Sequence, residues 1–333
     1  MRKILLLFLS LFLFQAAWSQ GDPSPQLQTR LTEAFSLEMP ELYYYPLYAR
    51  VLNEPDSLSI EQLTFTIDGQ EHNATPIGAG AYRFWWQPET YGTHEIVIFA
   101  QADNGNTASQ TLNLEVVNPQ GDRDVQTFEE SLINWPDPGQ TFQGSFVLPQ
   151  FTAAYNKITG YLSVTCPSIN GGCDDWDRLA HVELLAPNGE WVEFIRYITP
   201  FGVGCDHTID LTDYASLLQG AVDMRVRIGT WGTGGWNVSL RLEYESGTPE
   251  YIYTTVDRIW QANYPFGNPA NLDPVPDRSV SWSANIEEAK LRIVTTGHGW
   301  GENNTANAAE FYSGINQLRV NDAPFKGHFV WTT

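Results

Sequence analysis

Basic residues are scarce in this sequence, which excludes the classes of protein that bind polyanions. Lys and Arg number 18 against 39 Asp and Glu, giving a formal net charge of -21. A protein that binds the phosphate backbone of nucleic acids or an anionic membrane surface needs a basic face. We therefore expect no nucleic-acid partner. Only 17% of the residues are charged and 42% are hydrophobic, so the chain has ample material for folded cores.

Long apolar runs are lacking except at the N-terminus. Ile4–Phe14 contains no charged residue, follows Arg2 and Lys3, and precedes the small-x-small sequence Ala17-Trp18-Ser19. The run is too short to cross a bilayer as a helix, and its flanks are those of a signal peptide. We predict that residues 1–19 are a signal peptide. The mature chain is then secreted or periplasmic, with no membrane insertion after cleavage.

Cysteine is rare as well, with three residues in the whole chain. Export would make a disulfide permissible. Cys166 and Cys173 enclose six residues that resemble a tight loop, and a bridge between them would pin that loop. Cys205 is then a free thiol, forms a disulfide with another molecule, or takes the place of one of the other two cysteines in the bridge.

Clear amphipathic helices are missing, and short alternating segments take their place. Leu63, Phe65 and Ile67 alternate with polar residues, as in a half-buried strand. The fold class predicted is all-β. Residues 28–118 are expected to form an immunoglobulin-like sandwich, and residues 117–122 a linker. The runs Tyr43-Tyr44-Tyr45 and Trp85-Trp86 are expected to belong to its core and edge rather than to a ligand site.

The β pattern continues to the end of the chain. We predict strands at Ile158–Thr165, His181–Leu185, Trp191–Ile198, Met224–Ile228, Val238–Tyr244, Lys290–Thr295 and Ile315–Val320. A short helical turn is expected within residues 211–218, capped by Thr212 or Asp213. The 12 Trp, 15 Tyr and 17 Phe suit strands, and a surplus of aromatic side chains also suits sugar stacking.

The densest group of polar side chains is Cys173-Asp174-Asp175-Trp176-Asp177-Arg178. Crowded carboxylates shift one another's pKa and suit general acid–base work or activation of a water. The alternatives are a solvated acidic loop and a calcium site built from Asp174, Asp175 and Asp177. A second group is Gly297-His298-Gly299-Trp300-Gly301-Glu302, followed by Ala309-Glu310-Phe311; its alternative is a flexible turn with a surface glutamate.

Motifs for metal or serine chemistry are absent from the sequence. The six histidines are scattered, with no His-x-His or His-Glu-x-x-His pair. Cys205-Asp206-His207 offers only half of a metal site. There is no Gly-x-Ser-x-Gly elbow and no glycine loop for phosphate. We expect neither a metal nor a cofactor.

From about Gln143 the motifs become specific. They are Cys166-Pro167, Cys173–Arg178, Gly189-Glu190-Trp191, Ile198–Phe201, Ile209–Asp213, Thr230-Trp231 and Gly247–Tyr251, and then Leu291-Arg292, Gly297–Trp300 and Ala309–Phe311. In this order and at this spacing they resemble bacterial peptide-N-glycosidase F, an amidase that releases N-linked glycans from asparagine. The resemblance covers a little over half of the chain and does not extend to residues 20–120.

The resemblance implies a fold and a set of site residues. The family's fold is a pair of eight-stranded antiparallel jelly rolls with the site between them. Residues 123–250 would form the first, and residues 251–333 an incomplete second. The expected catalytic residues are Asp177 and Glu310. Substrate-binding roles fall on Arg178, Trp176, Trp231, His298 and Trp300, and the Cys166–Cys173 pair falls on a loop disulfide of the family.

Several positions depart from the family pattern. A further active-site glutamate stands directly before the family's Thr-Trp pair, and here that position is Gly229. Cysteines that flank the family's second-domain glutamate are Ala308 and Tyr312 here. The 83 residues after position 250 also fall short of the family's second domain.

Three functions follow, in decreasing order of support. The first is an exported amidase that acts on N-linked glycans or glycoproteins and is a hydrolase of linear amides. The alternative is a non-catalytic glycan-binding jelly-roll protein. A distant third, by analogy of architecture alone, is a copper monooxygenase-like protein, for which Met224 and scattered histidines are a poor ligand set.

Overall fold

A computed structural model of the protein describes residues 23–52, 58–262, 264, 275–281, 285–296 and 315–329. Over these residues the regular structure is strand, apart from one 3-10 turn at Thr212–Tyr214. The predicted all-β class is confirmed. The predicted signal peptide lies outside the described residues. In the part of the chain that is described, we find no helix long and apolar enough to cross a membrane.

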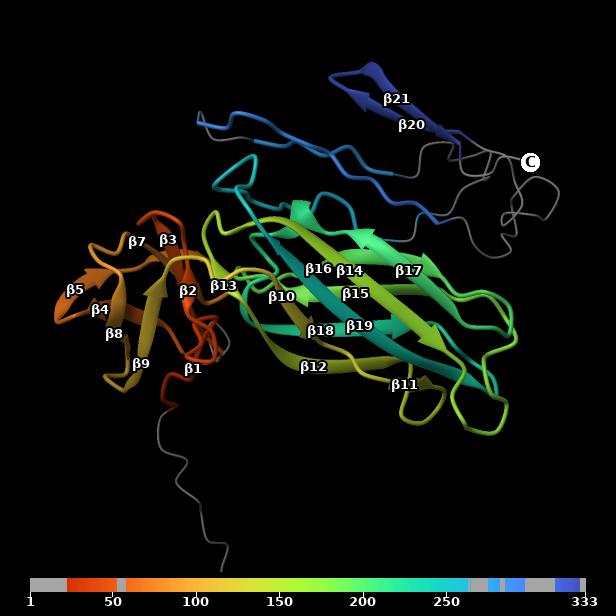
Figure 1. Ribbon diagram of the computed structural model, residues 1–333, viewed down its shortest axis with the longest axis horizontal. Coiled ribbons are helices and arrows are strands. Elements are labelled where there is room, and N and C mark those ends of the chain that lie inside the picture. Colours follow the sequence, from red (N-terminus) through yellow and green to blue (C-terminus); the bar gives the residue numbers. More distant parts are fainter. Residues whose placement is uncertain are drawn as a thin grey trace, which may run out of the picture.

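The N-terminal part consists of two sheets around one core (Figure 1). The first has the order β1-β3-β7-β6, with bounds Leu27–Thr29, Tyr45–Val51, Ala81–Trp86 and Thr75–Gly78. The second has the order β2-β9-β8-β4-β5, with bounds Leu37–Glu38, Thr107–Val117, Gly92–Ala102, Ile60–Ile67 and Gln70–Asn73. Alternation along β4 buries Leu63, Phe65 and Ile67, as predicted. The immunoglobulin-like assignment remains a prediction.

Neighbouring aromatic residues of this part divide between the core and the exposed surface. Tyr45 and Trp86 are buried, whereas their neighbours Tyr44 and Trp85 are exposed. Successive residues of a strand point to opposite faces of the sheet, so one member of each pair faces solvent.

The central part is a sandwich of two antiparallel sheets. One contains β10 (Arg123–Gln126), β19 (Gly235–Ser246), β14 (Tyr155–Thr165) and β17 (Cys205–Asp210), with β11 (Ser131–Asn134) also paired to β19. The other contains β12 (Thr141–Leu148), β18 (Gly220–Ile228), β15 (Leu179–Leu185) and β16 (Trp191–Ile198). The chain passes between the sheets at nearly every connection, and this strand order is that of a jelly roll. Its core includes the fully buried Trp236 and Tyr244.

Strand β2 joins the two parts. It pairs in parallel with β9 on one side and with β13 (Gln150–Phe151), which precedes the long strand β14, on the other. Glu38 of β2 is buried and accepts hydrogen bonds from Arg123 at 2.6 Å and from the hydroxyl of Tyr155 at 3.1 Å. Arg30 donates to the carbonyls of Leu217 and Gln219. The junction is therefore fixed by buried polar bonds as well as by backbone pairing.

Replacing Glu38 by alanine is expected to lower the free energy of unfolding by about 2–3 kcal/mol, because the donors of Arg123 and Tyr155 lose their acceptor. Glu71→Ala, which removes an exposed carboxylate on β5, is the matched control. Guanidinium denaturation followed by fluorescence measures both. Equal midpoints for the two variants would show that Glu38 does not secure the junction.

Two local predictions are wrong. Lys290–Thr295 is not a strand; Lys290 instead pairs with Asp213 at 3.0 Å, and Arg292 donates to the Asp210 carbonyl. The cap of the 3-10 turn is neither Thr212 nor Asp213. Asp210 accepts the backbone N–H of Thr212 at 3.0 Å, two residues on, as in an Asx turn.

The last described strands are β20 (Ile315–Val320) and β21 (Ala323–Phe329), which form a hairpin. The strand expected at Ile315–Val320 is confirmed. The wider expectation of an incomplete jelly roll over residues 251–333 remains a prediction.

Candidate active site

Four connections meet at one end of the jelly roll, the right-hand end in Figure 1. They are residues 135–140 between β11 and β12, 166–178 between β14 and β15, 199–204 between β16 and β17, and 229–234 between β18 and β19. Antiparallel neighbours return the chain to the same end of the sheet, so the topology collects residues far apart in sequence. The polar cluster predicted from the sequence is in the second connection.

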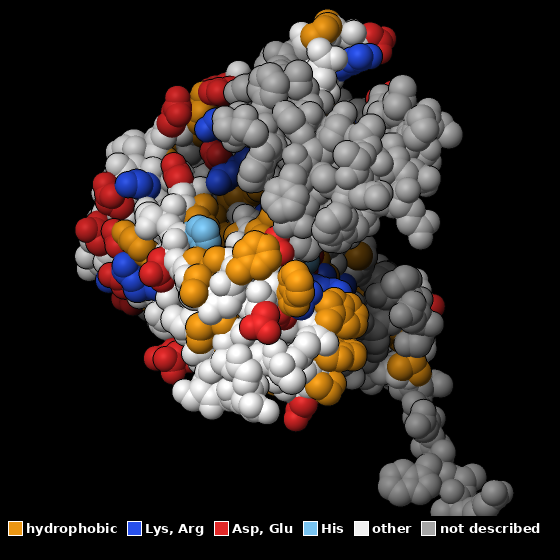
Figure 2. All heavy atoms as spheres, turned by 90° about the vertical axis from the view of Figure 1, so that its right-hand side faces the viewer, with side chains coloured by type: hydrophobic (Ala, Val, Ile, Leu, Met, Phe, Trp, Pro, Cys, Tyr) orange, Lys and Arg blue, Asp and Glu red, His pale blue; other side chains and the backbone are white. Residues whose placement is uncertain are grey.

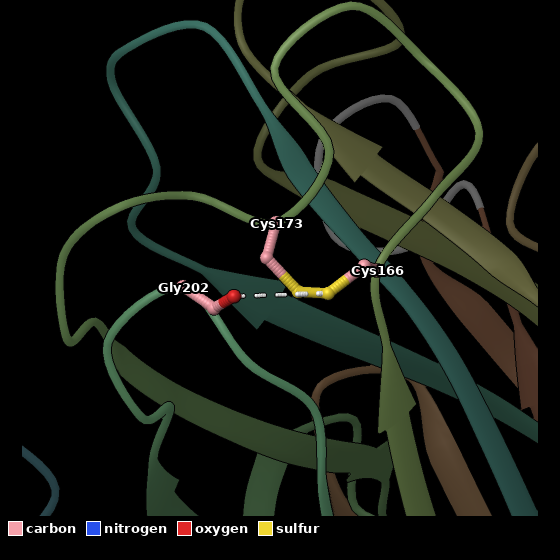
Figure 3. The surroundings of a disulfide bond; sticks show 3 residues. All are labelled: Cys166, Cys173 and Gly202. Carbon is pink, nitrogen blue, oxygen red and sulfur yellow. Dashed lines mark hydrogen bonds between the residues drawn. A yellow bond between two sulfur atoms is a disulfide. The ribbon is translucent and has the colours of Figure 1, made fainter.

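The second connection is pinned by a disulfide. Cys166 and Cys173 are bonded, as predicted, and the carbonyl oxygen of Gly202 lies 3.9 Å from Cys166 Sγ (Figure 3). Gly171 packs against the fourth connection so closely that a Cβ there would lie 2.5 Å from the backbone nitrogen of Gly234. Only glycine fits at that contact. Cys205 is free, and burial raises the pKa of its thiol.

Asp174 is the anchor of the site. Its side chain is 1% exposed, and its oxygens accept bonds from Arg178 Nε at 2.8 Å and Nη2 at 3.0 Å. The hydroxyl of Thr230, on the fourth connection, donates to it at 2.6 Å, and the backbone N–H of Trp176 at 3.0 Å. A buried carboxylate is stable only when donors of this kind surround it. Asp174 thus ties two connections together.

The same bonds set the ionisation of Asp174. Burial by itself raises the pKa of this carboxyl, but the hydrogen bonds from Arg178, Thr230 and the Trp176 backbone outweigh it, so the pKa lies below its usual value. Asp174 is therefore an ionised structural group. Because its oxygens are already engaged, the calcium site considered as an alternative for Asp174, Asp175 and Asp177 lacks its first ligand.

Asp177 lies between two fixed backbone positions. On one side the N–H of Trp176 is held by Asp174. On the other, Arg178 N–H donates to Thr199 Oγ1 at 2.8 Å, and Thr199 N–H donates to the Arg178 carbonyl at 2.9 Å. Asp177 itself is half-buried. Because the backbone is fixed at both neighbouring residues, little backbone entropy is lost at Asp177 when a ligand binds.

Exposed aromatic rings lie on the connections at this end of the jelly roll. Trp176 is 62% exposed, and Trp231, directly after the buried Thr230, is 61% exposed. Phe201 of the third connection and Trp135 of the first are exposed as well. Figure 2 looks onto this end and shows hydrophobic side chains gathered there beside acidic ones. Large exposed apolar groups clustered around polar ones are typical of a ligand site.

The structure brings the connection of three predicted site residues, Trp176, Asp177 and Arg178, together with that of Trp231 through the bond between Asp174 and Thr230. Glu310, His298 and Trp300 lie outside the described residues. Sequence reasoning missed the anchoring roles of Asp174 and Thr230. Asp174 and Arg178 carry opposite charges on one short loop, which is a weak signal for the ion pair, but nothing in the sequence linked Asp174 to Thr230, 56 residues later.

Metal ligands do not gather in the described ranges. No group of three or more His, Cys, Asp or Glu side chains there is arranged to hold a metal ion. Met224, considered above as a copper ligand, is fully buried in the jelly-roll core.

The chain is similar to a known amidase. It is 32% identical over 208 residues to peptide-N(4)-(N-acetyl-beta-D-glucosaminyl)asparagine amidase F of Elizabethkingia miricola, a match of 57% of this chain and 56% of that enzyme. The chain thus spans little more than half of the enzyme's length. Two solved structures of PNGase F, one from Flavobacterium meningosepticum, are 24% identical, with TM-score 0.49 over 63% of this chain and 71% of theirs. No family model matches the chain.

Proposed function

We propose that this protein is an exported amidase that cleaves the bond between an asparagine side chain and the first GlcNAc of N-linked glycans. The observation that carries the proposal is the placement of Asp177 between two anchored backbone positions, next to the exposed Trp176. The sequence identity to an amidase of that specificity supports it. Export rests on the predicted signal peptide at residues 1–19.

The reaction is hydrolysis of a linear amide. Asp177 accepts a proton from a water, which adds to the side-chain carbonyl carbon of the substrate asparagine. The carbon–nitrogen bond then breaks as the proton passes from Asp177 to the nitrogen, which leaves as an amine attached to the first GlcNAc. The products are a glycosylamine and a peptide that carries aspartate in place of asparagine.

The remaining roles follow the family resemblance. Glu310 is proposed as the second catalytic carboxylate, and Arg178, Trp176, Trp231, His298 and Trp300 as substrate-binding residues. Two nitrogens of Arg178 already bond to Asp174. Arg178 therefore presents a neutralised ion pair to the substrate, and we assign it a positioning role for the loop of Asp177 as well.

The test is incubation of the mature chain with an N-glycopeptide, followed by mass spectrometry of the peptide. Release of the whole glycan supports the proposal. An intact glycopeptide at high enzyme concentration, for a chain that is folded by circular dichroism, contradicts it.

Gly229 favours a second candidate, a glycan-binding protein without catalysis. The position lacks the carboxylate of the family pattern, while the exposed Trp176 and Trp231 keep an apolar surface for a sugar. Glycan binding without release in the assay above would select this candidate.

Gly229→Glu is expected to fold and to raise the rate of glycan release by at least about tenfold, because it restores the carboxylate that the family pattern has directly before the Thr-Trp pair, where it can accept a proton or a hydrogen bond. A Cβ at this position would meet only the Leu179 carbonyl, at 3.8 Å, which is ordinary van der Waals contact. Gly229→Gln is the control of equal size. Equal rates for the two variants, measured as kcat/KM on one glycopeptide, would refute a role for charge at this position.

A further inference from the structure

Trp135 stands beside the proposed site and has no role so far. It lies in the connection between β11 and β12 and is 42% exposed. Its ring centroid is 5.1 Å from that of Trp231, with 51° between the ring planes. Indole rings are usually buried, because each carries a large apolar surface. Two adjoining exposed indoles therefore form an apolar surface that folding has left uncovered.

The two rings are held in place from both sides. Thr230, next to Trp231, is fully buried and bonds through its hydroxyl to Asp174. Its carbonyl accepts a hydrogen bond at 2.6 Å from Nε2 of Gln140, which belongs to the connection of Trp135. That connection is closed by two backbone hydrogen bonds between Asn134 and Gly139. The backbone that carries the two rings is thus fixed before any ligand binds, which lowers the entropic cost of binding.

The chemistry of the surroundings favours a sugar as the occupant. The Trp135–Trp231 pair offers flat apolar faces, and a pyranose ring has an apolar C–H face and a polar rim. Gln140 lies on the connection of Trp135, and the acidic connection of Asp177 is tied to that of Trp231 by the bond between Asp174 and Thr230, so further donors and acceptors are present at this end of the jelly roll. A hydrophobic peptide partner would displace water from such groups without offering them new hydrogen bonds, which is unfavourable.

We propose that Trp135 and Trp231 together form a stacking platform for a pyranose ring of the glycan, with Trp135 as a substrate-binding residue. The proposal rests on the proposed function, since it names a sugar contact of the same site. It extends the site from the connection of Asp177, across that of Trp231, to the first connection of the jelly roll.

The test is calorimetric titration with a peptide that carries an N-linked core of three mannoses and two GlcNAc. All variants carry Asp177→Asn, so that the glycopeptide is not cleaved during the titration. Trp135→Ala should weaken binding about tenfold, as expected for losing one buried aromatic face. Trp135→Phe, which keeps a ring, should retain most of the affinity and serves if the alanine variant is unstable. Trp85→Ala removes an exposed indole from the N-terminal part and should change nothing.

The same titration with the unglycosylated peptide identifies the occupant. Loss of affinity confined to the glycopeptide supports the platform. An unchanged Kd in Trp135→Ala, or an equal loss with the bare peptide, overturns it. Binding that depends on Trp135 in a protein that releases no glycan would refute the amidase and leave the platform standing. Glycan release by the wild type, together with glycopeptide binding that does not depend on Trp135, would support the amidase and refute the platform.

Discussion

Asp177→Asn should lower the rate of glycan release by about 10²–10⁴-fold, the range in which a general base contributes. Asparagine has nearly the same shape as aspartate but does not accept a proton from water. The anchors on either side of position 177 involve the backbone of Trp176 and Arg178, so the substitution leaves the loop in place. The measurement is kcat/KM on a defined glycopeptide. Binding of the same glycopeptide should be nearly unchanged.

Asp175→Asn is the matched control, because Asp175 is an exposed carboxylate on the same loop. It should retain close to the full rate. Comparable rates for Asp177→Asn and the wild type would mean that another group activates the water. Equal losses in both variants would instead indicate a general effect of the loop's negative charge.

Asp174→Ala should lower the free energy of unfolding by about 3–5 kcal/mol, as for other buried ion pairs that lose one partner. Arg178 would be left without its carboxylate, and the buried hydroxyl of Thr230 without its acceptor. The loop between β14 and β15 would lose its link to the loop between β18 and β19. Chemical denaturation measures the change, with Asp175→Ala as the control for an exposed carboxylate.

The contribution of Asp174 to the free energy of unfolding depends on pH in a defined direction. Its pKa is lowered in the folded protein, so its stabilising effect is fully present above the unfolded-state pKa of about 3.9. The effect is lost as the pH falls through the lower, folded value. The stability difference between wild type and Asp174→Ala should therefore narrow in acid. A difference that stays constant from neutral pH down to pH ~2 would show that the ionised form is not what stabilises the loop.

Strands with a buried face were predictable because side-chain alternation is a local signal. The strand expected at Trp191–Ile198 has the bounds of β16, and the turn at Asn188-Gly189 closes its hairpin. Lys290–Thr295 shows similar alternation but is not a strand. A strand needs a neighbour for its backbone groups, and that requirement is not local.

The candidate site was predictable as a cluster, but the anchoring role of Asp174 was not. Residue types alone placed Asp174, Asp175 and Asp177 together, and only the family resemblance singled out Asp177. Their roles diverge because Thr230 and Thr199 arrive from other connections, the first bonding to the Asp174 carboxylate and the second to the Arg178 backbone. Such contacts depend on the order of strands in the jelly roll, which alternation alone does not encode.

Hydrolysis in water enriched in ¹⁸O tests the central proposal most directly. The wild-type chain and an N-glycopeptide are incubated together, and the peptide product is weighed. The amidase reaction predicts a peptide with aspartate at the glycosylation site and one ¹⁸O in its carboxylate, because water adds to the amide carbonyl. A peptide that keeps its asparagine, with or without a residual sugar, would contradict the amide bond as the site of cleavage.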